Sequence, residues 1–209
     1  SSEISTDLGE WLATAEQCVA GLRVQLIRQP RSPRPGRRRV FLGNSAGEHP
    51  ALFSSTLASL EGLRTIDLAA WADGKVPAGF SAYQAPLYLV CVHGKRDQCC
   101  ARLGMPVYSA LDALEGEHVW QTSHLGGHRF AATLLCLPEG LCYGRVGVAD
   151  VPALIDARRS GRVHDLDLFR GRTCHGAVAQ AADACARRHV GNMSIHGLGK
   201  PSIERDGGD

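Results

Sequence analysis

The sequence predicts an α/β protein in which a mixed β-sheet is flanked by helices. Short apolar runs typical of strands alternate with longer segments of helical periodicity. The 209 residues, 44% hydrophobic and 21% charged, are enough for one sizeable core. We expect an N-terminal α/β extension over residues 1–85, packed on a main domain over residues 86–209.

The N-terminal stretch predicts three strands and one helix. We expect strands over 22–27, 38–43 and 64–70, a helix over 49–63, and an irregular connector over 72–86. Residues 28–39 contain six arginines and three prolines. That segment favours a solvated loop over a nucleic-acid patch, and its role stays open.

The C-terminal stretch shows a sharper pattern. The run LYLVCV (87–92) is typical of a buried strand, a helix is expected over 105–116 with Pro106 in its first turn, and a strand follows over 118–123. The remaining elements are a hairpin formed by 130–138 and 141–148, a helix over 150–161 capped by Asp150, and a helix over 176–190. This order of elements matches a thioredoxin-like sheet.

Charge and hydropathy exclude several classes of protein. A net charge of +2 does not favour a polyanion binder, so no nucleic-acid partner is expected. The chain has no apolar run of the roughly 18 residues that a membrane span requires, and its first residues lack the pattern of a signal peptide. We therefore expect a cytoplasmic protein without a membrane partner.

Eight cysteines in a reducing compartment favour metal or redox roles over disulfides. Apolar or alanine-rich surroundings predict simple core packing for most of them, namely Cys18, Cys136, Cys142, Cys174 and Cys185. Cys91, Cys99 and Cys100 differ because they flank a polar loop, CVHGKRDQCC. These three are the candidates for chemistry.

A second loop, SHLGGHRF (123–130), carries His124 and His128 and also follows a predicted strand. Gly126 and Gly127 allow its backbone to wrap around a bulky group. Two cysteines and two histidines suit either zinc or an iron–sulfur cluster. The long cysteine spacing favours the cluster, but a zinc-stabilised Cys2His2 binding module and a thiol redox protein remain alternatives.

These residues carry a resemblance. The segments Cys91-Val-His-Gly-Lys-Arg-Asp-Gln-Cys-Cys100 and Val119-Trp-Gln-Thr-Ser-His-Leu-Gly-Gly-His-Arg-Phe-Ala-Ala132, with Gly104-Met-Pro106 and Tyr143-Gly-Arg145, resemble the sucrase/ferredoxin-like family. The resemblance implies a thioredoxin-like ferredoxin fold and a [2Fe–2S] cluster held by Cys91, Cys100, His124 and His128. Cys99 is then the spare thiol and the less favoured substitute for Cys100.

The same resemblance implies a one-electron carrier with unidentified redox partner proteins, and an enzyme is less favoured. A sucrase is not expected, because the sequence shows no convincing carboxylate pair in a sugar-binding context. With neutral imidazoles the oxidised centre is neutral, whereas an all-cysteine centre carries two negative charges, so we expect a higher potential that depends on pH. Lys95, Arg96 and Arg129 would raise this potential or dock an acidic partner, or are ordinary solvated charges.

Overall fold

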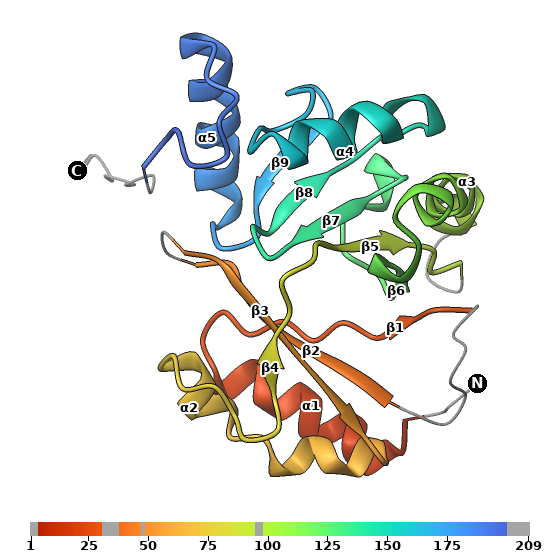
Figure 1. Ribbon diagram of the computed structural model, residues 1–209, viewed down its shortest axis with the longest axis vertical. Helices are drawn as coiled ribbons and strands as arrows, with labels where there is room; N and C mark the ends of the chain where they lie inside the picture. The colour runs from red at the N-terminus through yellow and green to blue at the C-terminus, as the bar shows by residue number, and fades with distance from the viewer. Residues whose placement is uncertain (1–3, 31–37, 47–48, 95–97, 200–209) are drawn as a thin grey trace, which may run out of the picture.

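The computed structural model describes residues 4–30, 38–46, 49–94 and 98–199. Figure 1 shows the layers: α3 and α4 lie above the main sheet, and a second sheet lies below it with α1 and α2 underneath. The helices of the described chain are α1 (Thr6–Cys18), α2 (Leu68–Ala72), α3 (Gln98–Glu115), α4 (Val151–Arg159) and α5 (Ala177–Val190). None of them is long and apolar enough to cross a membrane.

The main sheet has six strands in the order β1-β6-β5-β7-β8-β9. β5 and β6 are parallel and are connected through α3, whereas the other neighbouring strands are antiparallel. The strands are β1 (Ile27–Arg28), β5 (Leu87–Cys91), β6 (Val119–Thr122), β7 (Leu134–Leu137), β8 (Leu141–Tyr143) and β9 (Phe169–Arg172). The predicted strand, helix, strand, hairpin and helix are therefore confirmed, and with them the mixed sheet flanked by helices.

The two faces of this sheet contact different cores because successive strand residues point to opposite sides. Tyr88 and Val90 of β5 pack with Leu111 of α3 and Leu154 of α4 in the larger core. Leu87 and Leu89 face the other way, toward a smaller cluster that includes Leu52, Trp120, Leu135 and, partly buried, Phe41. β5 pairs with β6 on one side and β7 on the other, and all five of its residues are buried.

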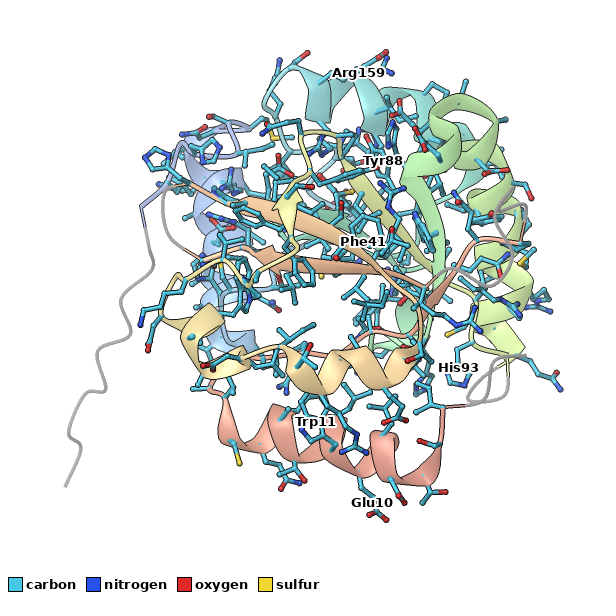
Figure 2. The ribbon with its side chains drawn as sticks, turned by 60° about the horizontal axis from the view of Figure 1, so that its bottom comes forward. Glu10, Trp11, Phe41, Tyr88, His93 and Arg159 are labelled. Carbon is cyan, nitrogen blue, oxygen red and sulfur yellow. The ribbon has the colours of Figure 1, made fainter. Side chains whose placement is uncertain are left out.

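The second sheet joins the N-terminal half to the smaller cluster. Its strands are β2 (Arg38–Asn44), β3 (Ala51–Leu57) and β4 (Ser81–Ala82). The Phe41 ring lies edge-on to Trp120, with their centroids 5.6 Å apart, and Figure 2 shows Phe41 in the interior. β1 also pairs with β6, so the N-terminal half contributes an edge strand to the main sheet. The division at residue 85 stays a prediction.

Three predicted elements of the N-terminal half are wrong. The expected helix over 49–63 is strand β3 followed by the 3₁₀ helix η1 (Leu60–Thr65), since its Ser-Ser-Thr run is weak in helices and pairs along its length with β2. The expected strand over 64–70 is the end of η1 and the start of α2, because the Asp67 carboxylate accepts from the Ala70 N–H and caps the helix.

The expected strand over 22–27 is much shorter than predicted, since only Ile27 lies in regular pairing. In the arginine-rich segment, residues 31–37 lie outside the described residues.

Helix α3 differs from its prediction in a way that concerns function. It extends from Gln98 to Glu115, so Pro106 lies inside it and not in its first turn. Its buried positions follow helical spacing from end to end: Cys100, Gly104, Val107, Tyr108 and Leu111. The burial of this whole face against the sheet outweighs the hydrogen bond that Pro106 removes. Cys100 therefore lies on a helix and not in a loop.

The prediction of core packing for five cysteines is only partly correct. Cys136 is buried and Cys142 half-buried, and burial raises the pKa of the Cys142 thiol to about 11 and that of Cys136 further. Cys174 is half-buried, whereas Cys18 and Cys185 are exposed. Those two lie on the solvent side of amphipathic helices, where an alanine-rich neighbourhood does not imply burial.

Candidate metal centre

The candidate centre lies at one edge of the main sheet, where parallel strands β5 and β6 end together. Cys91 is the last residue of β5 and pairs in register with Thr122, the last residue of β6. Because the strands are parallel, the chain leaves both of them at the same edge. Helix α3 follows β5 in the connection to β6, so its first turn, which contains Cys100, lies at this edge of the sheet as well.

Three ligand atoms converge there. Nδ1 of His124 lies 4.0 Å from Sγ of Cys91 and 3.9 Å from Sγ of Cys100, and the three atoms all lie within 4.8 Å of one another. Cys91 is 0% exposed and Cys100 1% exposed, whereas His124 is half-buried. Two sulfurs are thus held in the protein interior, and the imidazole closes the group from the solvent side.

This donor set fits a metal centre of the zinc or iron–sulfur type. Thiolate and imidazole are the ligands that these centres prefer, and carboxylates are absent from the group. A sulfur at about 2.3 Å and a nitrogen at about 2.0 Å from one tetrahedral ion lie about 3.5 Å apart. The observed Sγ–Nδ1 separations of 4.0 and 3.9 Å are longer by about 0.4–0.5 Å. The first turn of α3 adds a favourable dipole for negative ligand charge at Cys100.

Gly104 permits the close approach of α3 to β5. A Cβ at this position would collide with the carbonyl oxygen of Cys91 and also contact the side chain of Val92. Gly104 lies one helical turn after Cys100 on the buried face. Any larger residue would push the helix away from the strand end and separate the two thiols. The sequence reasoning did not assign this role, although the buried spacing along the helix contains the signal.

The histidine loop is built differently. Gly126 and Gly127 have φ values of 89° and 64°, in the left-handed region that favours glycine, and the loop then enters the 3₁₀ helix η3 (His128–Phe130). The rings of His124 and His128 lie 6.3 Å apart between centroids, at an interplanar angle of 29°. His128 is exposed and lies outside the group of three converging ligand atoms.

His93 connects the two loops. The backbone N–H of His124 donates to Nδ1 of His93 at 3.2 Å. Since Nδ1 accepts this bond, His93 is neutral with its proton on Nε2 when the bond is made. Figure 2 shows His93 at the right of the view, whereas Arg159 of α4 is at the top. The sequence pattern does not single out His93, yet its contact fixes the backbone of a candidate ligand.

The structure thus brings together three of the four predicted ligands, Cys91, Cys100 and His124, and places the fourth, His128, beside His124. Cys99 is exposed, and the converging sulfur belongs to its neighbour Cys100. Lys95 and Arg96 lie outside the described residues. The assignment of all four ligands stays a prediction.

A comparison with known proteins finds a relative that matches part of this chain. The chain is 33% identical over 95 residues to altered inheritance of mitochondria protein 32 of Meyerozyma guilliermondii. The matched region covers 41% of this chain and 34% of that relative. The chain thus spans about a third of the length of that relative.

Among solved structures, two of a thioredoxin-like [2Fe–2S] ferredoxin from Aquifex aeolicus are similar to part of the chain. One is 16% identical with a TM-score of 0.38, covering 43% of this chain and 94% of the ferredoxin. The other, of the wild-type protein, is 17% identical with a TM-score of 0.37, covering 43% and 100%.

The family assignment rests on a match of greater extent. The model of the sucrase/ferredoxin-like family matches residues 23–171. This range includes both strands that end at the candidate centre, the helix between them, and every residue of the cysteine and histidine loops. The chain belongs to the sucrase/ferredoxin-like family.

Proposed function

We propose that this protein is a one-electron carrier and that Cys91, Cys100, His124 and His128 hold its [2Fe–2S] cluster. The observation that carries the proposal is the convergence of two fully buried thiols and one imidazole at the edge of the sheet, within 4.8 Å of one another. When bound, the cluster supplies one reversible electron.

The protein supplies two different environments to that group. Cys91 and Cys100 come from a central strand and a packed helix, so the sulfur positions are defined by the core and are shielded from water. His124 and His128 come from the loop and lie toward solvent. An electron can therefore reach a partner protein through the histidine side without opening the core.

Ligation by two histidines is the finer part of the proposal. The near-stacked rings of His124 and His128, 6.3 Å apart, support a shared role for the pair. Replacing two thiolates by two neutral imidazoles removes negative charge, so the reduction potential lies above that of plant-type ferredoxins. An imidazole nitrogen that reaches solvent can take up a proton with the electron, and this makes the potential depend on pH.

The test is iron and acid-labile sulfide analysis of anaerobically purified protein, with its visible absorption spectrum. We expect two irons and two sulfides per chain and a red-brown colour. A colourless protein with one zinc per chain would instead establish the zinc-stabilised binding module. A metal-free protein whose Cys99 or Cys100 exchanges with disulfides would establish the thiol redox protein.

A further inference from the structure

A cluster of arginines surrounds Phe130, the residue that ends η3 and lies two positions after His128. The guanidinium carbons of Arg129, Arg145 and Arg170 lie 4.7, 5.5 and 4.5 Å from the centroid of the Phe130 ring. We name these four residues the Phe130 arginine patch. Arg129 and Arg145 are exposed, and Arg170 is half-buried.

The patch is assembled from separate parts of the chain. Arg129 comes from η3, Arg170 from β9, and Arg145 from the segment after β8. The backbone N–H of Arg145 donates to the carbonyl of Phe130 at 2.7 Å, which ties that segment to η3. Arg145 has a φ of 62°, a left-handed conformation that a glycine would adopt at lower cost. An arginine is thus held where the backbone disfavours it.

Positive charge dominates the patch. All three guanidinium carbons lie within 5.5 Å of one ring centroid, so no two are more than about 10 Å apart, close to the Debye length of about 8 Å at physiological ionic strength. Burial, then the charges of Arg145 and Arg188, lower the pKa of Arg170. Nε of Arg170 is buried and makes no hydrogen bond within the structure.

The neighbouring carboxylate of Asp167 offsets only part of this charge. Asp167 pairs with Arg188 at 3.1 Å, and both side chains are largely exposed. Arg170 contacts the backbone carbonyl of Asp167, at 2.9 Å, and not its carboxylate. Within the described part of the chain Asp167 is shared with Arg188, so carboxylates of a partner would relieve the remaining repulsion of the patch.

We propose that the Phe130 arginine patch is the docking surface for an acidic redox partner, a protein that presents clustered Asp and Glu side chains. This proposal rests on the proposed function, because Arg129 directly follows His128 in η3 and both residues are exposed. A partner seated on it lies beside His128. Electron-transfer complexes bury small interfaces, and charged rims steer them together.

A protein fits this surface better than a nucleic acid does. Nucleic-acid binders present an extended basic stripe and a pI above about 9. This chain has a net charge of +2 and a pI of about 8.2, and the patch is grouped around a single ring.

The first test measures binding without using the redox centre. A short fluorescein-labelled poly-L-glutamate peptide is titrated with the protein at low ionic strength, and its fluorescence anisotropy is followed. The test variant is Arg129→Gln/Arg145→Gln. The control is Lys75→Gln/Arg162→Gln, which removes the same charge from exposed positions after α2 and after α4. We expect binding about fivefold or more weaker in the test variant, near wild type in the control, and lost at high salt.

The second test follows electron transfer by the reduced holoprotein. Ferricyanide, an anion, accepts one electron per reduced centre and becomes ferrocyanide; tris(phenanthroline)cobalt(III), a cation, likewise accepts one. The test variant is expected to react several-fold more slowly with ferricyanide and faster with the cobalt complex, and the control to change little.

Two results would overturn the docking surface: equal weakening in the test and control variants, or tighter binding of an oligonucleotide than of the peptide at equal charge. A protein that lacks iron but still distinguishes the two variants in peptide binding would overturn the proposed function and leave the acidic docking surface standing. An iron-containing protein that does not distinguish them would overturn the docking surface alone.

Discussion

The two sides of the candidate centre are built on different kinds of structure. The cysteine side consists of the end of β5 and the first turn of α3, and Cys91 and Cys100 are almost completely buried. The histidine side is a loop with two left-handed glycines, in which His124 is half-buried and His128 is exposed.

The two sides of the candidate centre are therefore suited to different roles. A thiol held by packed regular structure has little freedom, so the cysteine side determines where a metal centre lies. A loop near solvent can adjust, take up protons and meet a partner, which suits the histidine side for exchange with the surroundings. The predictions below remove features of each side in turn.

The largest effect is expected from the buried thiols. Cys91→Ser or Cys100→Ser should abolish the iron content and the visible absorption, because a serine hydroxyl does not supply the thiolate charge that holds ferric iron. The measurement is iron per chain together with the absorption spectrum. Cys99→Ser is the matched control, with an exposed neighbouring thiol, and should keep both. A colourless Cys99 variant beside a coloured Cys100 variant would reverse the ligand assignment.

The next largest effect is expected at Gly104, where α3 packs closely against the end of β5. Gly104→Ala should lower both iron content and stability, since the added Cβ collides with the Cys91 carbonyl and forces the helix from the strand. Overpacking of this kind costs about 1–3 kcal/mol in the free energy of unfolding.

Denaturant unfolding with iron analysis measures both effects of the Gly104 change. Gly176→Ala is the control, because a Cβ there meets nothing within 4 Å and its φ of −67° suits any residue. Full iron occupancy in the Gly104 variant would show that the close approach is dispensable.

The convergence of Cys91, Cys100 and His124 could be predicted from sequence, for a physical reason. A β-strand, a crossover helix and a parallel strand bring their loops to one sheet edge, so the order of elements alone places the cysteine and histidine loops together. The roles of Gly104 and His93 could not be predicted, because they depend on distances across the fold: the backbone of Cys91 above Gly104, and the N–H of His124 beside His93.

The fold was predicted well where local pattern and burial agree. The buried run at β5 and the hairpin of β7 and β8 have apolar sequences that only a central sheet position satisfies. The errors lie in the N-terminal half, where β3 contains Ser54 and Ser55 in place of a strong strand signal. Its strand state depends on pairing with β2, a contact that local pattern does not encode.

On the histidine side the expected effects are smaller, because the loop can adjust. His128→Cys should keep the centre but lower its midpoint potential, on the order of 100 mV, since a thiolate adds one negative charge where the imidazole was neutral. A redox titration followed by electron paramagnetic resonance measures the shift. His118→Cys, at a site where the imidazole bonds Tyr83 at 2.6 Å, should leave the potential unchanged. An unaltered potential and spectrum in the His128 variant would remove His128 from the ligand set.

The last and smallest effect is the dependence of the potential on pH, which only the solvent side of the centre can produce. If His124 and His128 are ligands, the oxidised state loses an imidazole proton as pH rises through its pKa, while the reduced state still holds it. The oxidised state is then favoured, so the midpoint potential should fall by up to about 59 mV per pH unit for each proton taken up with the electron.

The slope of the potential against pH should vanish above the pKa of the reduced state. It should also weaken in His128→Cys, because one titrating nitrogen is gone. Voltammetry from about pH 6 to pH 10 measures the profile. A flat profile over that range with an intact spectrum would mean that the histidines do not exchange protons with solvent, and the contrast between a rigid cysteine side and an exchanging histidine side would no longer hold.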